Sequence, residues 1–472
     1  MIRLIGGEMP GFTESRPPAG GGLLGHIADQ VPAGVEVLVA GPHDRALIDT
    51  VKTRSSVTCL VRSQTAAAEL DARGLDVLCG SLTKLEAGRW DVIVAFDGVD
   101  RLCSVEGPQL DWAESVQALK RSLRPGGTLL LAVENSLGVH RLVDPGIPTA
   151  AQTDDAWRPL GEFDGSRPGT PARLTARFEA EGLTVGWLAA AWPEPGSPTL
   201  AATAEALENE ALAALAARAA GVAYANRSVL SDPRRLAAAA VRAGLGAELA
   251  ASWLVVAHLA PSESPAVTSL PPVLTEAGPL DRPLPQGHLV EELLLAACLR
   301  HDLPTVRRLL TGWIAALPGA TADNVVVDGD TYTMLDPSVP AEADVLHRFA
   351  RTLLTGGYAH PWPAATDPQA LTAILHGAAG LSGDVPAAPD GDDPPLPDAR
   401  REHEEQLRAL NRRLADAESR ADMSERELAK REEELRKARA QIATFSGSIG
   451  YRMAKLGYGA ARKARNRLRK RT

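Results

Sequence analysis

The stretch Val35-Glu36-Val37-Leu38-Val39-Ala40-Gly41 decides the fold, because it predicts a buried strand that breaks into a turn at a glycine. Three further strands are predicted over residues 57–62, 75–79 and 91–96, and helix-like stretches such as 64–73 separate the first three strands. Strands that alternate with helices at this spacing predict a doubly wound, mostly parallel α/β sheet. Such a sheet binds its ligand at the carboxyl ends of its strands.

The first predicted domain extends over residues 1–262. A fifth strand is predicted over 128–133, a sixth over 183–191 and a closing seventh over 252–257. An alanine-dense insertion at 202–251 is expected to be helical, because alanine has the highest helix propensity. The sheet is therefore predicted to have seven strands, and the proline-rich residues 263–285 are predicted to form a linker.

A smaller α+β unit is predicted over residues 286–380. It has amphipathic helical patterns at 288–301 and 306–317, and a further helix near 342–354. Between them, Asp328-Gly329 is a hairpin turn signal. Residues 381–400 are rich in proline and aspartate and are expected to be a second linker.

Composition indicates a cytoplasmic globular protein of two or three domains without a metal site. The 472 residues are 45% apolar and 23% charged. The four cysteines and ten histidines match no metal-ligand or redox spacing, and the cysteines are expected to be buried small hydrophobes. No signal peptide is expected at the first residues, and the most apolar stretch, 249–260, is too short to span a bilayer.

A heptad pattern at residues 401–445 predicts a coiled coil. Its seam positions alternate by three and four over more than five heptads, which is about 60 Å of helix at 1.5 Å per residue. They are Leu407, Leu410, Leu414, Ala417, Ala421, Ser424, Leu428, Arg431, Leu435, Ala438, Ile442 and Phe445. We interpret the segment as a weak oligomerisation rod; a lone charged helix is the alternative.

The tail, residues 446–472, is predicted to be a basic amphipathic helix. It holds nine Arg or Lys and no acidic residue. The net charge of the whole chain is −9, so the residues before the tail carry a net charge of −18. Ile449, Met453 and Leu456 fall on one side of the helix, as in helices that lie on anionic membrane surfaces. Nucleic-acid binding is the rival interpretation, and the acidic body of the chain argues against it.

Three motifs in this order resemble class I S-adenosylmethionine-dependent methyltransferases: the turn at Gly41, Trp90-Asp91-Val92-Ile93-Val94-Ala95-Phe96-Asp97, and Leu123-Arg124-Pro125-Gly126-Gly127-Thr128. A closer resemblance, over about residues 20–260, is to methyltransferases of bacterial surface-polysaccharide biosynthesis. It is carried by Glu134-Asn135-Ser136-Leu137-Gly138, the proline-rich stretch 192–199 and the strand 252–257. The resemblance implies S-adenosylmethionine as cofactor, and a hydroxyl of a surface glycan or its lipid-linked precursor as acceptor.

Residues 323–336 resemble part of a small-molecule kinase, with Asn324 in the catalytic loop and Asp336 as the metal-binding acid. Gly319 stands where the catalytic aspartate belongs, so we interpret the small unit as a kinase-like remnant without kinase activity. The order of methyltransferase, remnant and coiled coil resembles O-antigen chain-terminating methyltransferase–kinases. This resemblance suggests a link between the coiled coil and chain-length control. We expect the rod to hold another copy or a glycosyltransferase, and the tail to hold the chain at the inner face of the cell membrane.

The expected cofactor-binding residues are Gly41, Asp44, Ser81 and Asp97, and the motifs around them depart from the family pattern. The first motif of the family is acid-x-Gly-x-Gly, and this chain has Val39-Ala40-Gly41-Pro42-His43 in its place. Gly41 keeps the first glycine, but the acid and the second glycine are absent. The ribose-binding acid aligns with Val61 or Arg62, and the adenine-contacting acid aligns with Ser81. A register slip would return Asp44 or Asp49 to a cofactor role. Each lost charge-assisted hydrogen bond costs about 1.5–3 kcal/mol of cofactor binding.

The expected catalytic residues are Glu134 and Asn135, which follow the fifth strand at the same edge of the sheet. Glu134 is placed to act as general base on a sugar hydroxyl. The alternative is that both residues only cap the following loop, and nearby His140 is expected to be exposed. Two hypotheses follow: a glycan O-methyltransferase, or an inactive methyltransferase-fold scaffold that organises a glycan-assembly complex.

Overall fold

The structure is a computed structural model of the whole chain. It describes residues 1–14, 16–105, 107–144, 164–225, 227, 229–260, 267, 270–365, 367–381, 400–447 and 449–468. These residues belong to two units, Met1–Arg400 and Arg401–Thr472. Most of the predicted second linker, 381–400, lies outside the described residues.

Within the described part of the chain, the large sheet has eleven strands, so the prediction of seven is wrong. All seven predicted strands are present: β2 (Glu36–Ala40), β3 (Ser56–Val61), β4 (Asp76–Gly80), β5 (Trp90–Ala95), β6 (Leu123–Glu134), β7 (Leu183–Trp192) and β9 (Ser252–Leu259). The added strands are β1 (Ile2–Gly6), β8 (Leu200–Ala202), β10 (Val273–Thr275) and β11 (Gly278–Pro279). β8, β10 and β11 have only two or three residues each, and β10 and β11 lie in the predicted linker, where the chain still pairs through its backbone.

The sheet order is β1-β4-β3-β2-β5-β6-β9-β7-β8-β10-β11. The strands from β1 to β6 are parallel to their neighbours, while β9 is antiparallel to both β6 and β7. The order reverses at β2, which lies between β3 and β5. The sheet is thus methyltransferase-like and mostly parallel, and its topological switch point is at the end of β2.

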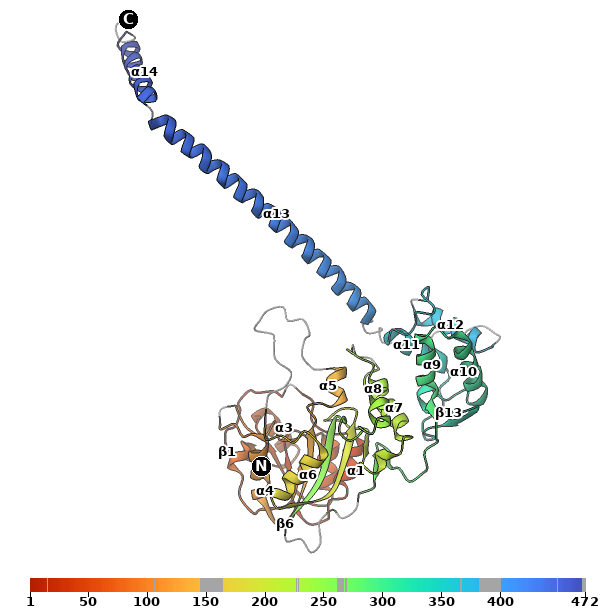
Figure 1. The fold of residues 1–472 in the computed structure, drawn as a ribbon. Coiled ribbons are helices and arrows are strands. Elements are labelled where there is room, and N and C mark those ends of the chain that lie inside the picture. Colours follow the sequence, from red (N-terminus) through yellow and green to blue (C-terminus); the bar gives the residue numbers. More distant parts are fainter. Residues whose placement is uncertain are drawn as a thin grey trace. The chain divides into compact units, whose positions relative to one another are not determined.

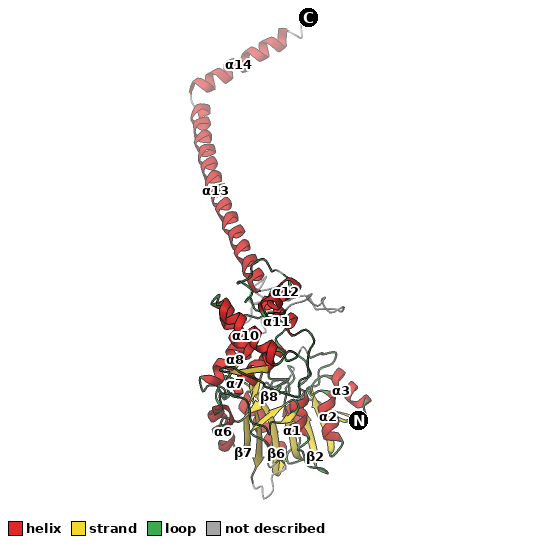
Figure 2. Ribbon diagram, turned by 90° about the vertical axis from the view of Figure 1, so that its right-hand side faces the viewer, coloured by secondary structure: helices red, strands yellow, loops and turns green. Residues whose placement is uncertain are grey.

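Helices cover both faces of this sheet (Figure 2). Alternate residues of β2 show the division, because Leu38 and Ala40 join one hydrophobic core while Val37 and Val39 join the other. One core holds α4 (Trp112–Ser122), α6 (Pro171–Ala180), α7 (Leu212–Ala223) and α8 (Pro233–Arg242). The other holds α1 (Gly22–Ala28), α2 (Arg45–Lys52) and α3 (Gln64–Ala72). The predicted helical insertion is therefore α7 and α8, with Pro233 in the first turn of α8 and Asp232 as its N-cap.

The small unit has its own core and packs beside α7 and α8 (Figure 1). It contains β12 (His288–Leu289), α9 (Val290–Leu299), α10 (Leu303–Ala316), β13 (Val325–Asp328), β14 (Thr331–Met334), α11 (Val345–Thr355) and α12 (Pro368–Ala378). The predicted hairpin is confirmed: β13 and β14 pair, and Gly329 in the turn has φ +59°. Trp313 and Phe349 meet edge to face at the centre of the core, with their rings 6.1 Å apart.

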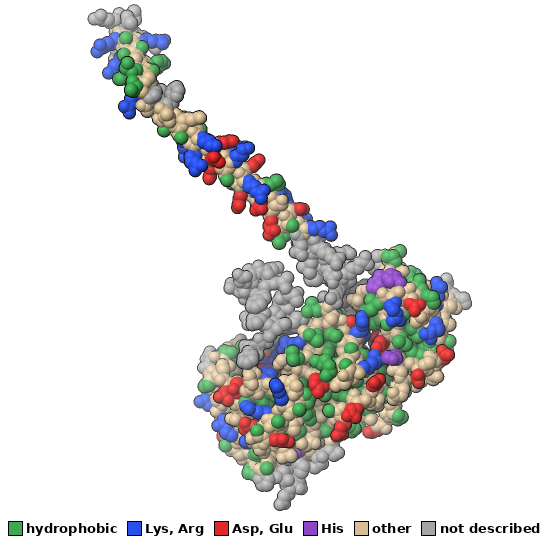
Figure 3. All heavy atoms as spheres, viewed as in Figure 1, with side chains coloured by type: hydrophobic (Ala, Val, Ile, Leu, Met, Phe, Trp, Pro, Cys, Tyr) green, Lys and Arg blue, Asp and Glu red, His purple; other side chains and the backbone are tan. Residues whose placement is uncertain are grey.

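The second unit consists of α13 (Arg400–Gly447) and α14 (Ile449–Leu468). Both predicted helices are present, and the pairing of α13 with another helix stays a prediction. Side chains of both signs follow one another along α13, whereas basic and apolar side chains cover α14 (Figure 3). None of the described helices combines the length and the apolar character that a membrane span requires.

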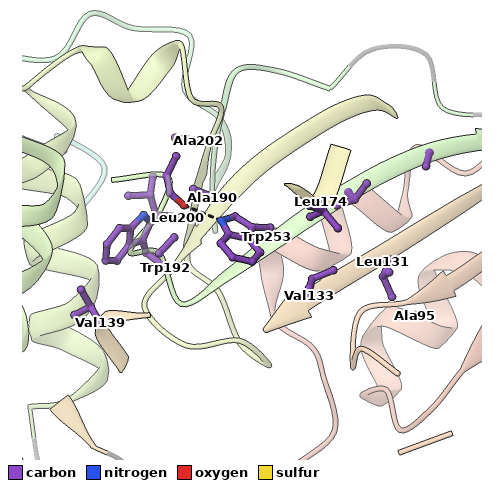
Figure 4. Packing of buried hydrophobic residues seen from close by; sticks show 14 of the residues in the cluster. Ala95, Leu131, Val133, Val139, Leu174, Ala190, Trp192, Leu200, Ala202 and Trp253 are labelled. Carbon is purple, nitrogen blue, oxygen red and sulfur yellow. Dashed lines mark hydrogen bonds between the residues drawn. The ribbon is translucent and has the colours of Figure 1, made fainter. Parts of the chain in front are cut away.

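We predict that Trp253→Phe destabilises the N-terminal domain. Trp253 is fully buried beside Trp192 (Figure 4), and its indole Nε1 donates a 2.7 Å hydrogen bond to the Ala247 carbonyl. Phenylalanine leaves that carbonyl unpaired, so the free energy of unfolding should fall by about 1–3 kcal/mol in urea titrations. Trp362→Phe, a half-buried control in the small unit, should cost less than half as much. An equal loss of unfolding free energy in the two variants would contradict a stabilising role of the Trp253 hydrogen bond.

Candidate functional site

The expected ligand edge of the sheet is centred on Gly41, directly after β2. Gly41 has φ +94°, and a Cβ built there would lie 3.4 Å from Asp97 Oδ2 and from Leu102 Cδ2. Its amide donates to the Leu60 carbonyl at 2.9 Å. The structure therefore brings Gly41 and Asp97 together, as expected for residues that follow β2 and β5.

His43 fixes this turn from within. The imidazole is buried, with Nδ1 3.0 Å from the Gly41 carbonyl and Nε2 accepting from the Phe96 amide at 3.0 Å. Burial lowers the pKa of His43 to about 4. The ring is therefore neutral at physiological pH, with its proton on Nδ1, and ties the ends of β2 and β5 together.

A segment of the N-terminus covers the same edge. We call residues 9–20 the strap; Ser15 within it is outside the described residues. Its first part pairs with the end of β3: the Met9 amide donates to the Arg62 carbonyl at 2.8 Å, and Ser63 Oγ donates to the Phe12 carbonyl at 2.6 Å. Its last part pairs with the turn after β2, where the Ala19 amide donates to the Pro42 carbonyl at 3.0 Å. The strap thus crosses the carboxyl ends of β3 and β2.

Two arginines clasp the strap to the domain. Arg62 holds Glu14 through a bidentate pair, with Nε–Oε1 at 2.8 Å and Nη2–Oε2 at 2.9 Å. Arg101 is 5% exposed; it donates to the Arg16 carbonyl at 2.8 Å, the Pro17 carbonyl at 2.9 Å, and Asp97. Burial raises the pKa of Asp97, while the Arg101 guanidinium opposes that shift. Both charges are paired away from water, where unpaired ions are costly.

The residues at this edge do not fit an adenosine cofactor in this arrangement. At the position expected for the ribose-binding acid, Arg62 offers only donors, and a guanidinium cannot accept bonds from ribose hydroxyls. Ser81 is buried, its amide bonds the Gly6 carbonyl at 2.9 Å, and a Cβ built on Gly7 would lie 3.0 Å from its Cβ. Asp44 caps α2 and accepts from the amides of Leu47 and Gly21 at 2.7 and 3.1 Å. Each candidate acid already has a partner within the chain.

Asn135 is fully buried and holds the loop after β6. Its Nδ2 donates to the carbonyls of Glu248 and Ala250 at 2.6 and 2.9 Å, and its Oδ1 accepts from the Leu137 amide at 3.0 Å. These bonds agree with the capping alternative.

Glu134 lies beside Asn135, at the end of β6, among three basic side chains. Its contacts are Arg16 at 3.5 Å, His140 at 3.3 Å and Arg141. Burial alone raises the pKa of Glu134, but the His140 hydrogen bond and the positive charges of Arg141 and Arg16 outweigh it and hold the pKa at about 2. A carboxylate of such low basicity is a poor general base at neutral pH. His140 is buried rather than exposed, because it packs against this carboxylate.

A second polar cluster lies between α8 and the small unit, and the sequence analysis missed it. It lines a cleft of about 1240 Å³. Arg234 contacts Asp232 at 3.1 Å and Glu291 at 3.5 Å, and the Tyr358 hydroxyl donates to Asp232. Asp232-Pro233 could be recognised as a helix start, but nothing in the sequence signals that Glu291 lies opposite.

In the small unit, the side-chain amide of Asn324 bonds to the backbone of Asp336. Asn324 Nδ2 donates to the Asp336 carbonyl and its Oδ1 accepts from the Asp336 amide, both at 2.9 Å. The Asp336 carboxylate accepts from Ser338. Among the residues that the structure describes, no His, Cys, Asp or Glu cluster could hold a metal ion, and all four cysteines are free and buried.

No protein-family model and no curated protein matches this chain. Similar solved structures include a methyltransferase from Geobacter sulfurreducens in complex with S-adenosylhomocysteine (18% identity, TM-score 0.27, 52% of this chain and 93% of that chain). Another is an S-adenosylmethionine-dependent methyltransferase from Mesorhizobium loti (13%, 0.27, 48% and 91%). A third is the cyclase SpnF (15%, 0.28, 50% and 80%). All three are below 20% identical to this chain, and their TM-scores are below 0.3.

We predict that Glu291 makes stability depend on pH. Glu291 is buried, and burial raises its pKa from 4.5 to about 7, although Arg234 opposes the shift. The folded state then binds more protons than the unfolded state, so stability is greatest below pH 4.5 and falls as pH rises toward 7. The loss is at most about 3 kcal/mol. In urea titrations at pH 5 and pH 8, Glu291→Gln should lose less stability between the two values than wild type.

Glu292→Gln is the matched control, because Glu292 is only half-buried and pairs with Arg242 at 2.7 Å. It should keep the pH dependence of the wild type. The same pH dependence in Glu291→Gln as in wild type would show that Glu291 does not titrate in this range.

Proposed function

We propose that this chain is a methyltransferase-fold scaffold that organises a membrane-associated glycan-assembly complex. The observation that carries the proposal is the strap, which is held at the carboxyl edge of the sheet by the Arg62–Glu14 pair and by the bonds from Arg101 to two strap carbonyls. The glycan context comes from the sequence resemblance to surface-polysaccharide methyltransferases.

The energetics favour this proposal over catalysis. A cofactor at Gly41 has to displace the strap, and with it the bidentate Arg62–Glu14 pair and the Arg101 bonds to the strap carbonyls. Charge-assisted hydrogen bonds contribute about 1.5–3 kcal/mol each. Opening therefore costs several kcal/mol, and each 1.4 kcal/mol weakens the apparent cofactor affinity about tenfold.

A glycan O-methyltransferase is the second candidate. The observation that favours it is that Gly41, Asp97 and Glu134 all lie at the carboxyl edge of one sheet, where this fold binds ligands. In that case the strap is a gate over a cofactor site, and Glu134 positions the acceptor more readily than it removes a proton.

The second unit supplies the attachments in this proposal. Helix α13 is the rod that holds another copy of the chain or a glycosyltransferase. Helix α14 exposes Ile449, Met453 and Leu456 together with basic residues, a combination suited to an anionic membrane surface. The assembled glycan or its lipid-linked precursor is then the ligand that the complex presents at the inner face of the membrane.

Titration calorimetry with S-adenosylmethionine tests the scaffold. We expect no binding to the full chain at millimolar ligand, because the strap and Arg62 leave no acceptor for the ribose. Binding at micromolar concentration would overturn the proposal.

The Glu14→Arg variant distinguishes a working cofactor site that the strap covers from a site that can no longer bind the cofactor. The new charge repels Arg62 and should release the strap, which hydrogen exchange of residues 9–14 would report. We expect that the variant still fails to bind the cofactor, since Arg62 remains. Micromolar binding by this variant alone would show that the strap gates a working site, and the methyltransferase candidate would replace the scaffold.

Flotation with liposomes tests the tail. The full chain should float with vesicles that contain phosphatidylglycerol and remain at the bottom with neutral vesicles. A chain that ends before Arg462 loses seven basic residues and should bind anionic vesicles at least about tenfold more weakly, because each basic residue contributes about 1 kcal/mol. Equal flotation of both chains would rule out membrane attachment through the tail.

A further inference from the structure

The apolar seam of α13 is exposed over its described side chains. Leu414 is 58% exposed, Leu428 61% and Ile442 66%, on a helix whose described side chains are all exposed. The side chains of Leu407 and Phe445 fall outside the described residues, so the argument concerns positions 410–442. Leucines on a narrow stripe with a strict alternation by three and four are suited to a second helix of the same kind.

The charged positions beside the seam select the orientation of that helix. The seam residues that are followed by the next seam residue after three places, such as Leu414, occupy position a of the heptad. In a parallel pair in register, the residue just before each of these positions faces the residue five places further along on the second copy. Four such pairs are charged on both sides, and three of them are attractive. The attractive pairs are Arg413 with Glu418, Arg420 with Glu425, and Glu434 with Arg439; the repulsive pair is Glu427 with Glu432.

An antiparallel pair with the same overlap has the opposite balance. Glu425 then faces Glu425 of the second copy, Glu427 faces Glu427, and Glu418 faces Glu432. Only Arg420 with Glu434 attracts. Because like charges in these positions oppose pairing, the antiparallel arrangement is disfavoured.

Arg431 favours a coil of two chains over a coil of three. In the parallel pair it faces Arg431 of the second copy, and Glu427 and Glu432, the one repulsive pair beside the seam, flank this contact with opposite charge. In a two-stranded coil a long side chain at the seam can extend its charged end to the edge of the interface, where these two carboxylates lie. A third chain would enclose the guanidinium in the core, away from water.

We propose that residues 410–442 pair with a second copy of this chain as a parallel, in-register, two-stranded coiled coil. The pairing itself rests on the seam and its charges, and only its use in a membrane complex rests on the proposed function. Parallel pairing brings two α14 helices to the same end of the rod. Membrane attachment then becomes bivalent, which raises the overall affinity without any new contact.

Disulfide trapping tests the orientation in the full chain. The four native cysteines are buried and free, so an added surface cysteine can be followed alone. Ser424→Cys lies on the seam and meets itself in the second copy only if the helices are parallel and in register. Under mild oxidation we expect most of this variant to form a covalent dimer. Met423→Cys, one position away and directed outward, should form at least about tenfold less.

Charge reversal and sedimentation test the partner. Wild type should sediment at twice the chain mass of 49.7 kDa at micromolar concentration. Arg420→Glu should raise the dissociation constant about tenfold or more, and Arg420→Glu with Glu425→Arg should restore it. Arg426→Glu, on the outward face, should have no effect.

A chain that stays monomeric and does not cross-link would overturn the proposal in favour of a different protein partner. A mass of three chains, or efficient trapping of Met423→Cys, would also overturn it. None of these outcomes alters the cofactor titration, so failure of the coiled coil and failure of the scaffold are distinguishable.

Discussion

The guanidinium of Arg101 is the interaction on which the arrangement of the N-terminal domain depends. It lies almost fully buried between Asp97 and the strap, so its charge has to be neutralised and its donors have to be used. Asp97 provides the charge, and two strap carbonyls provide the remaining acceptors. Removal of Asp97 leaves the guanidinium without a counter-ion inside the protein, and release of the strap leaves two of its donors without acceptors. The strap, the end of β5 and the turn at Gly41 therefore stabilise one another.

The residues at this edge of the sheet differ from the methyltransferase pattern described in the sequence. A methyltransferase needs free carboxylates at the strand ends to receive ribose and adenine. In this chain the corresponding edge has Arg62, Ser81 and His43, and each of them bonds to the chain itself. The ligand edge of this sheet is part of the internal packing of the domain. Fold and function are separable in this way, because function resides in the side chains that the fold presents.

Continuous apolar runs explain why the seven predicted strands were found, since residues such as Val37–Ala40 are buried on both faces of the sheet. The short edge strands were missed because β8, β10 and β11 pair through two or three residues and have no pattern of their own. The strap was missed for a related reason: it is held by carbonyls and by arginines distant in sequence. Gly41 and Asp97 could be brought together from strand order alone. The low pKa of Glu134 comes mainly from His140 and Arg141, which are nearby in sequence. Arg16 adds a smaller contribution from more than a hundred residues away, and no local motif reports that contact.

The length of α13 sets a limit on what can bind at both of its ends. Forty-eight helical residues extend about 70 Å, whereas a compact globular protein of 150 residues is only about 40 Å across. A single small domain docked on α14 cannot also reach the first turns of α13. Any factor that senses both ends at once must be elongated or must contain several domains.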